Sequence, residues 1–351
     1  MPTQELDYIS IQGFKSIRSI RKLALNPINI VVGANGSGKS NFIGAFMFLH
    51  EIHAGRLNDY VRTTGGAERL LHFGSKVTPS IRMEVSFRRH ADNYSLNLIS
   101  TQDDMLAPID EPDYGSDKDR ALRRQARSHG PRQDLDRWRL YHVHDTSATS
   151  PLRKTAKTHD NDFLRADGAN LPAFLYLLQE KYPDAYSLIR RTVRKVAPFF
   201  DDFVLRPDAL NEEFIRLAWR HKNSDQYFNA AALSDGTLRF IALATLFLQP
   251  AALRPSVILV DEPELGLHPY AIAILAALIK QTSAQGQVIL STQSPLLLDH
   301  FAPEDVLVAE RREGGTDIHR LESDALADWL DDYSLGQLWE KNEFGGRPGE
   351  G

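Results

Sequence analysis

Residues 33–40 read GANGSGKS, and this stretch decides how the rest of the 351-residue chain is expected to fold. It matches the pattern G-x-x-x-x-G-K-[ST], whose glycines let successive backbone N–H groups face a phosphate. Lys39 is expected to bind the β- and γ-phosphates of a nucleotide, and the Ser40 hydroxyl is expected to ligate Mg²⁺. The residues expected to contact the nucleotide in this loop are Asn35, Gly36, Ser37, Gly38, Lys39, Ser40 and Asn41.

The residues on both sides of the loop support this interpretation. Residues 28–32, INIVV, are apolar and β-branched and lie between Pro27 and Gly33, which predicts a buried strand of a parallel sheet. Residues 41–55 predict a helix that Gly55 ends. A glycine-rich turn that matches by chance is the alternative, and a strand, loop and helix in register disfavour it.

A second block, VILVDEP at residues 257–263, predicts a buried strand that ends in two carboxylates. Ligands bind at this edge of open α/β sheets. Asp261 is expected to hold Mg²⁺ and Glu262 to polarise the attacking water. An ordinary strand that leads into an acidic loop is the alternative. A whole lobe separates Lys39 from Asp261, so the site is expected to form from distant parts of the chain, unlike the site of a compact kinase or GTPase.

A third block, LSDGTLR at residues 233–239, predicts the capped start of a helix, with Ser234 as N-cap and Asp235 in the first turn. A helix cap without further function is one interpretation. The other is a helix start that faces a phosphate. Because one nucleotide already has its loop at Gly33, this second helix start is expected to serve the nucleotide of another subunit.

These blocks resemble the ABC-type ATPase head of the chromosome-maintenance (SMC), RecF and OLD-like branch. The resemblance is carried by GANGSGKSN, LSDGTLR, ILVDEPELGLHP and LSTQSPLLLD, in this order along the chain. ISIQGFKSI, YHVHDTS and YSLGQLWEKNEFGGRP further resemble small stand-alone bacterial "AAA family" ATPases, so the resemblance covers nearly the whole chain.

The resemblance implies roles for individual residues. Lys15 and Ser16 match a position that touches nucleotide phosphate in this branch. The signature residues Ser234, Asp235 and Gly236 match residues that reach the γ-phosphate across a dimer, with LSDG in place of LSGG. The loop at residues 266–269, GLHP, matches a loop that contacts the partner subunit.

The switch loop departs from the family pattern. Gln293 stands where such heads usually carry a histidine, and it is expected to position the γ-phosphate or water because an amide does not titrate near neutral pH. Gln102 is a weak candidate for the glutamine of the Q-loop, and solvent exposure is the favoured interpretation of that residue.

Composition limits the remaining function classes. The net charge of −5 gives no whole-chain basic signal for nucleic acid, and the lack of cysteine excludes disulfides, thiolate metal sites and a cysteine nucleophile. The chain has no apolar run long enough for a membrane span, and its start lacks the apolar core of a signal peptide, so a cytoplasmic protein without a membrane partner is expected. Five arginines between residues 120 and 132 have aspartates around them. Two interpretations are equally favoured: the arginines contact the phosphates of a nucleic acid, or they pair with these aspartates on a solvent-exposed surface. His142 and His144 are expected on one face of a strand with no evident third metal ligand, which disfavours a metal site there.

The predicted fold class is α/β, an ABC-ATPase-like P-loop NTPase with a mixed sheet and an inserted, partly helical lobe. Four parts are expected: residues 1–100 and 233–324 as the two portions of the nucleotide-binding lobe, residues 101–232 as the inserted lobe, and residues 325–351 as a helical tail.

The predicted function is that of an ATPase that uses ATP and Mg²⁺ and forms a homodimer around two ATP molecules. It is expected to act as a switch for a separate, nuclease-like effector protein, in DNA repair or anti-phage defence, with nucleic acid as a further partner. An ABC transporter ATPase subunit and a P-loop kinase are the alternatives.

Overall fold

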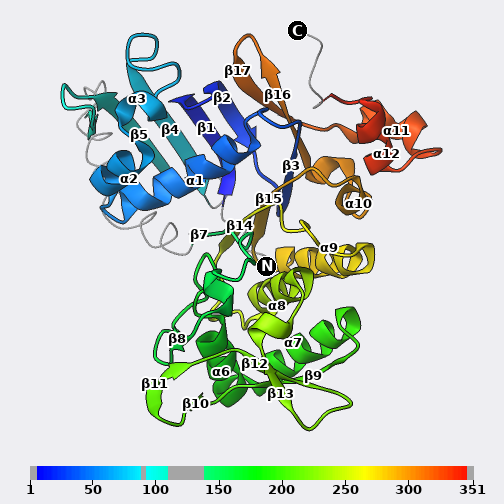
Figure 1. Ribbon diagram of the computed structural model, residues 1–351. Helices are drawn as coiled ribbons and strands as arrows, with labels where there is room; N and C mark the ends of the chain where they lie inside the picture. Colours follow the sequence, from blue (N-terminus) through cyan, green and yellow to red (C-terminus); the bar gives the residue numbers. More distant parts are fainter. Residues whose placement is uncertain (1–5, 88–91, 110–137, 346–351) are drawn as a thin grey trace. The chain divides into compact units, whose positions relative to one another are not determined.

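A computed structural model describes residues 6–87, 92–109 and 138–345 (Figure 1). The chain forms two compact units, which are described separately. The first comprises residues 1–139, 256–259 and 286–351, and the second comprises residues 140–255 and 260–285. Among the described residues, no helix is both long enough and apolar enough to cross a bilayer.

The first unit contains a five-stranded antiparallel sheet with the order β2-β1-β4-β5-β6. Residues 81–87 and 94–99, whose side chains alternate in character, lie in neighbouring antiparallel strands, with Ile81 opposite Leu98. Its strands are β1 (Leu6–Phe14), β2 (Ile17–Ala24), β4 (Ser80–Phe87), β5 (Asp92–Ser100) and β6 (Leu106–Pro108).

The second sheet has six strands in the order β17-β16-β3-β15-β14-β7. Strand β3 is fully buried and pairs in parallel with both β15 and β16, whereas β17 pairs with β16 in the antiparallel direction. The predicted α/β fold with a mixed sheet is therefore confirmed. The strands are β3 (Ile28–Val32), β7 (Trp138–Tyr141), β14 (Val257–Asp261), β15 (Gln287–Thr292), β16 (Val306–Arg312) and β17 (Gly315–Arg320).

Helix α1 (Lys39–His53) follows the GANGSGKS loop and contacts both β15 and β1, so it packs between the five-stranded and the six-stranded sheet. Its buried side is mainly aromatic and aliphatic, which explains why it holds the sheets together. The first unit also contains α2 (Leu57–Thr64), α3 (Ala67–Leu70), α10 (Pro295–Leu298), α11 (Ser323–Leu330), α12 (Leu335–Lys341) and the short η3 (Pro303–Asp305).

The second unit is built around α8 (Asp235–Leu248), in which every residue from Thr237 to Leu248 is buried. Helices α7 (Pro183–Val196) and α9 (Pro269–Ser283) both contact α8, and α6 (Leu171–Lys181) contacts α7 (Figure 1). Two small sheets complete the unit, made of β8 (Ala156–Lys157), β9 (Phe200–Val204), β10 (Pro207–Asp208), β11 (Asn211–Ile215), β12 (Ala218–His221) and β13 (Tyr227–Asn229), together with the short helices η1 (Pro151–Arg153) and η2 (Ala230–Ala232).

In three places a continuous sequence pattern covers two elements of the structure. Residues 170–194 have helical periodicity throughout but form two helices, because Pro183 starts a new helix and cannot continue the previous one. The predicted helical tail contains two helices as well, since Ser334 caps the second one and forms a capping box with Gln337. Residues 214–219 have the pattern of one strand but form the end of β11 and the start of β12.

Some sequence-based features lie outside the described residues. The arginines at positions 120, 123, 124, 127 and 132 are among them, as is most of the expected acidic and basic insertion. We retain the four-part division of the chain as a proposal.

Within the first unit, Gln287 joins the start of β15 to β1. Its buried amide donates to the carbonyls of Leu6 (3.1 Å) and Asn26 (2.9 Å) and accepts from the Leu6 N–H (3.2 Å). The substitution Gln287→Leu removes these three hydrogen bonds from a buried side chain, which we expect to lower the free energy of unfolding by about 1–3 kcal/mol. Urea unfolding measures this loss. Gln281→Leu, at an exposed position of α9, is the matched control, and an equal effect of the two changes would contradict the assignment.

Candidate nucleotide site

The GANGSGKS loop connects the buried end of β3 to the first residue of α1, as its sequence predicts. Gly36 and Gly38 have φ values of 79° and 107°, a region that residues with a Cβ atom rarely occupy. A Cβ atom at Gly38 would also clash with the Thr316 hydroxyl. The loop therefore depends on glycine for both its backbone conformation and its close packing.

Two side chains of the loop are arranged to receive an anion. The Ser37 hydroxyl is buried and has no hydrogen-bond partner among the described residues. Lys39 is buried, and its ammonium donates to the carbonyls of Gly33 (2.7 Å) and Ala34 (3.0 Å) of the same loop. Ser40 is exposed at the start of α1. Since a helix N-terminus has unsatisfied N–H groups and a positive partial charge, this arrangement fits a phosphate.

Lys15 and Ser16 form the tight turn between β1 and β2, and the turn is hydrogen-bonded to the phosphate loop. The Asn41 side-chain amide in α1 donates to the Ser16 hydroxyl over 2.7 Å. Lys15 has a φ of 49° and its N–H donates to the Leu70 carbonyl. Burial lowers the pKa of the Lys15 ammonium, which lies 5.4 Å from the centroid of the Phe14 ring.

Thr316 in β17 is a residue that the sequence analysis missed. Its hydroxyl lies 2.7 Å from the Ser16 hydroxyl and 2.9 Å from the Ser37 carbonyl oxygen. Its backbone N–H also donates to the Ser16 carbonyl. Thr316 thus joins the turn at Ser16 to the phosphate loop. A single threonine in an ordinary strand carries no motif, so the residue could not have been found from its sequence context.

Gln293 follows β15 directly, at the edge of the sheet where the phosphate loop follows β3. Thr292 of β15 pairs with Val32 of β3 in the parallel register, so Gln293 and Gly33 both leave the sheet at this edge. The Thr292 hydroxyl accepts from the Ser294 N–H (3.0 Å), and Ser294 caps α10. Gln293 is partly buried. Gln102, by contrast, is exposed on the turn after β5 in the other sheet.

In the second unit, Asp261 is the last residue of β14 and Glu262 follows it with a φ of 39°. This left-handed conformation is strained for a residue with a side chain, and such strain is typical of functional positions. Both carboxylates are partly buried.

Asp261 lies close to His142 and His144, for which the sequence predicts no third metal ligand. One ligand atom each from His142, His144 and Asp261 lie within 4.8 Å of one another. The expectation that these histidines lack a third ligand was therefore wrong. The histidines follow β7 instead of lying in a strand, and the third group comes from a strand remote in sequence.

The signature residues lie at the start of α8. The Ser234 side chain accepts from the Thr237 N–H (3.3 Å) as N-cap, and the exposed Asp235 carboxylate pairs with Arg153 at 2.6 Å. Arg153 also donates to the carbonyls of Thr146 (2.8 Å) and Ala230 (2.6 Å). The aspartate that replaces a glycine of the family signature is thus held by an arginine that also binds two neighbouring segments.

The signature and the GLHP loop are in contact within the second unit. A Cβ atom at Gly236 would lie only 2.6 Å from the Gly266 carbonyl oxygen, so the two backbones touch. Leu265, beside this contact, is 49% exposed, and Tyr270 at the start of α9 is 55% exposed. Ser234 and Asp235 are exposed as well. The start of α8 and the GLHP loop therefore form one continuous surface with apolar side chains, which we call the signature face.

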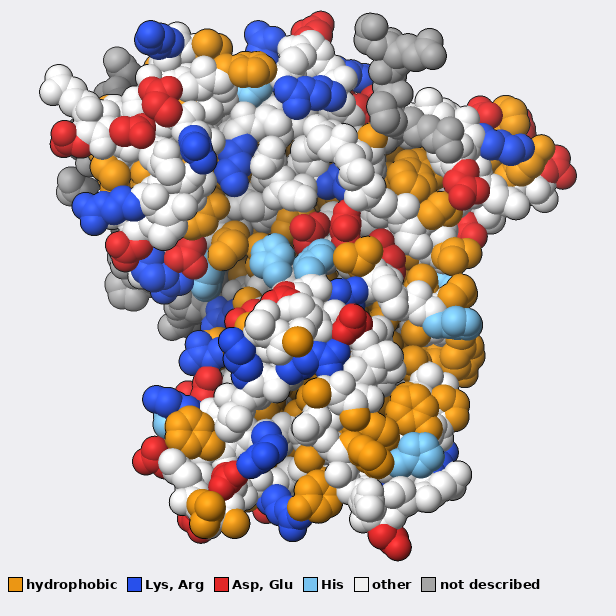
Figure 2. All heavy atoms as spheres, viewed as in Figure 1, with side chains coloured by type: hydrophobic (Ala, Val, Ile, Leu, Met, Phe, Trp, Pro, Cys, Tyr) orange, Lys and Arg blue, Asp and Glu red, His pale blue; other side chains and the backbone are white. Residues whose placement is uncertain are grey.

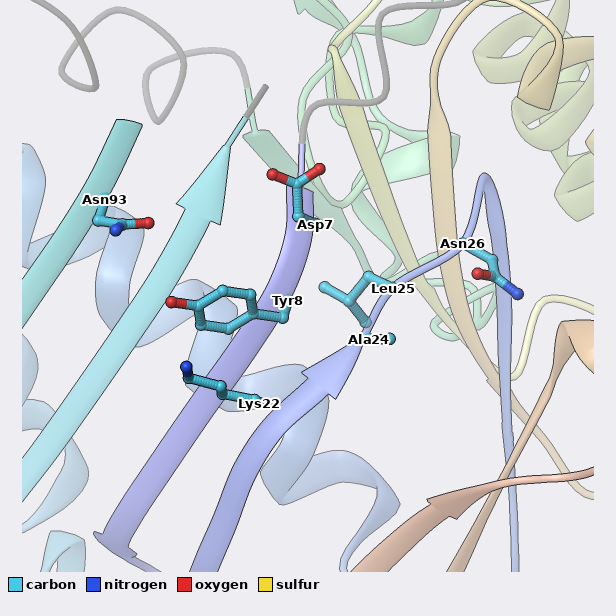
Figure 3. A pocket seen from close by; sticks show the side chains of 7 residues that line it. All are labelled: Asp7, Tyr8, Lys22, Ala24, Leu25, Asn26 and Asn93. Atoms are coloured by element: carbon cyan, nitrogen blue, oxygen red, sulfur yellow. The ribbon is translucent and has the colours of Figure 1, made fainter. Parts of the chain in front are cut away.

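A hollow of about 720 Å³ lies elsewhere in the first unit, beside β1, β2 and β5, and the side chains that line it are drawn in Figure 3. The Lys22 ammonium lies 5.7 Å from the Tyr8 ring centroid there, and the Tyr8 hydroxyl donates to Glu84 (2.5 Å). Desolvation, with the neighbouring Glu84, raises the pKa of Tyr8 to about 12. This hollow contains none of the predicted site residues. On the face seen in Figure 2, acidic and basic side chains are interspersed.

The chain matches a protein family and several solved structures. A family model described as "AAA domain, putative AbiEii toxin, Type IV TA system" matches residues 28–299. An SMC head bound to the C-winged helix domain of ScpA is 17% identical, with a TM-score of 0.64 over 92% of this chain and 99% of that chain. An SMC head with an extended coiled coil, bound to the C-terminal domain of ScpA derived from Pyrococcus furiosus, is 15% identical, with a TM-score of 0.58 over 93% and 99% of the two chains.

These structural matches confirm the fold of an SMC ATPase head, a P-loop NTPase fold. Among curated proteins, "Urease accessory protein 2" from Cryptococcus neoformans var. grubii is 40% identical over 77 residues. That match covers 21% of this chain and only 6% of the curated protein, so it carries no argument about function.

Thr316 provides a test of the phosphate loop. Thr316→Val keeps the side-chain shape but removes the hydroxyl that links Ser16 to the Ser37 carbonyl. We expect the affinity for ATP to fall about tenfold, which corresponds to about 1.4 kcal/mol. Titration with a fluorescent ATP analogue measures the change. Thr63→Val, at an exposed position of α2, is the control, and unchanged affinity in the Thr316 variant would refute the role of this contact.

Proposed function

The chain belongs to the AAA-domain family whose model matches residues 28–299, and on that premise we propose that it is an ATPase switch that closes into a homodimer around two ATP molecules. Hydrolysis reopens the dimer. The observation that carries the proposal is the combination of a glycine-dependent phosphate loop with an exposed second helix start at Ser234.

ATP binding is supported by the loop and its surroundings. The buried Ser37 hydroxyl and the start of α1 suit phosphate oxygens, and Lys39 can exchange its bonds to loop carbonyls for bonds to phosphate. We assign phosphate contact also to Asn35, Gly36, Gly38, Asn41, Lys15 and Ser16.

The proposed cation is Mg²⁺. The Ser40 hydroxyl and the Asp261 carboxylate offer the hard oxygen ligands that this ion prefers. Bound there, Mg²⁺ would neutralise charge on the phosphates.

Hydrolysis is assigned to Glu262, with Gln293 in a positioning role. The strained φ of 39° at Glu262 supports a functional carboxylate because such a conformation persists only where the surrounding structure imposes it. Glu262 would accept a proton from the attacking water. Gln293 can donate an amide hydrogen to the γ-phosphate or hold the water through its carbonyl oxygen.

Dimerisation is assigned to the signature face. Ser234, Asp235 and Gly236 would reach the γ-phosphate held by the partner subunit. The exposed Leu265 and Tyr270 provide apolar area beside them, which favours association when it is removed from water. The ion pair between Asp235 and Arg153 holds the helix start in place before the partner arrives.

A separate effector protein is also proposed. Two of the similar SMC heads are described in complex with domains of ScpA, and the family description names a toxin of a toxin–antitoxin system. These descriptions support an ATPase that acts on another protein. A nuclease-like effector and a role in DNA repair or anti-phage defence remain proposals from the sequence resemblance, as does contact with nucleic acid.

Glu262→Gln provides the main test of the switch. The variant keeps the size of the side chain but cannot accept a proton, so we expect phosphate release to fall by about 10²–10⁴-fold. We expect the variant to be dimeric with ATP and Mg²⁺ and monomeric without nucleotide, as measured by light scattering. A monomer under both conditions would overturn the dimer proposal. Wild-type phosphate release that strictly requires an added small-molecule acceptor would favour the kinase alternative.

A second variant tests the signature face. Leu265→Arg in the Glu262→Gln background places a charge on this face, and we expect it to abolish the ATP-dependent dimer without loss of ATP binding. The matched control is Leu210→Arg, since Leu210 is 98% exposed in the turn between β10 and β11. A dimer that survives Leu265→Arg but not Leu210→Arg would place the interface elsewhere.

A further inference from the structure

The group formed by His142, His144 and Asp261 has a chemistry that the proposed Mg²⁺ site does not explain. Mg²⁺ prefers oxygen ligands, whereas two of the three converging groups are imidazoles. Imidazole nitrogen suits Zn²⁺, Mn²⁺ and other transition-metal ions. All three residues belong to the second unit, so their convergence is a property of one compact body.

The hydrogen bonding of His144 points to a ligand. Its Nε2 atom is buried and has no hydrogen-bond partner among the residues that the structure describes. A buried ring nitrogen without a partner loses its bonds to water and gains nothing in return. Coordination of a metal ion by this nitrogen would remove that cost.

The backbone that carries the two histidines is held in place on both sides. The His142 N–H donates to the Ala166 carbonyl at 2.9 Å. The buried Arg239 guanidinium donates to the carbonyls of Val143 (2.8 Å) and His144 (2.6 Å). Arg239 belongs to the LSDGTLR block, so the signature helix positions the histidine segment. Ligands held this way lose little freedom when an ion binds.

His142 is exposed, whereas His144 and Asp261 are partly buried. The exposure of His142 gives an ion a path from solvent.

We infer that His142, His144 and Asp261 form a binding site for a divalent transition-metal ion such as Mn²⁺ or Zn²⁺. Two nitrogens and one carboxylate oxygen make a three-ligand site with open positions for water or a phosphate oxygen. Asp261 takes part both in this site and in the proposed Mg²⁺ site. The second unit can therefore bind a metal before any nucleotide is present.

The test uses Mn²⁺ with the full-length, nucleotide-free protein. Free Mn²⁺ is measured by electron paramagnetic resonance during titration, and pulsed measurements on the bound ion detect coupling to imidazole ¹⁴N. We expect a single bound ion per chain, with ¹⁴N coupling, that excess Mg²⁺ does not displace. Bound Mn²⁺ without ¹⁴N coupling, or no binding at all, would overturn the inference, and this measurement requires no variant.

Variants identify the ligands. His142→Ala and His144→Ala are each expected to weaken Mn²⁺ binding at least about tenfold. His159→Ala, at an exposed position of the same unit, is the matched control and is expected to bind as the wild type does. Equal binding by all three variants would overturn the inference. Because no ATP is present, the metal site and the ATP-dependent dimer can fail independently of each other.

Discussion

The hydroxyl of Thr316 is the contact on which the phosphate loop depends. It lies within hydrogen-bond distance of both the Ser16 hydroxyl and the Ser37 carbonyl, although Thr316 and Ser16 are 300 residues apart. The Asn41 amide adds a third segment, the start of α1. A phosphate loop must present its N–H groups in a fixed array before the nucleotide arrives, because ordering the loop at binding would cost affinity. The hydrogen bonds of Thr316 and Asn41 hold the loop in such an array.

In the second unit, two arginines join segments that lie far apart in the sequence. Arg153 connects the start of α8 to the segments at Thr146 and Ala230, and Arg239 connects α8 to the histidine segment. Both use the planar guanidinium, which can donate to several carbonyls at once. Burial lowers the pKa of Arg239 through desolvation, which nearby acidic groups oppose, and its bonds to two carbonyls compensate for lost water. Through Arg239 and the Asp235–Arg153 ion pair, the signature helix α8 is thus connected to the histidine segment and to the segments at Thr146 and Ala230.

Short-range sequence patterns were sufficient to predict the helices and strands next to the motifs. β3 has the predicted bounds, α8 begins at the predicted cap, and α1 follows the glycine-rich loop. Each depends on short-range effects: β-branched residues, a capping hydroxyl, or glycines in left-handed conformations. The errors occurred where a local pattern continued across a break, as at Pro183, where the unbroken helix would need a backbone N–H that proline lacks.

The sequence by itself determined the P-loop NTPase fold class, through motifs that resemble an ABC-type ATPase head. It also determined the strand, loop and helix start around residues 33–40 and the strand that ends at Asp261, because these local elements follow from dihedral preferences and hydrophobic patterns within a few residues. Only the tertiary structure decided that Thr316 supports the loop, that Arg239 holds the histidine segment, and that Asp261 joins His142 and His144. These contacts depend on strand order and on helix packing. Both arise from burial of apolar surface across the whole chain, and no local pattern encodes them.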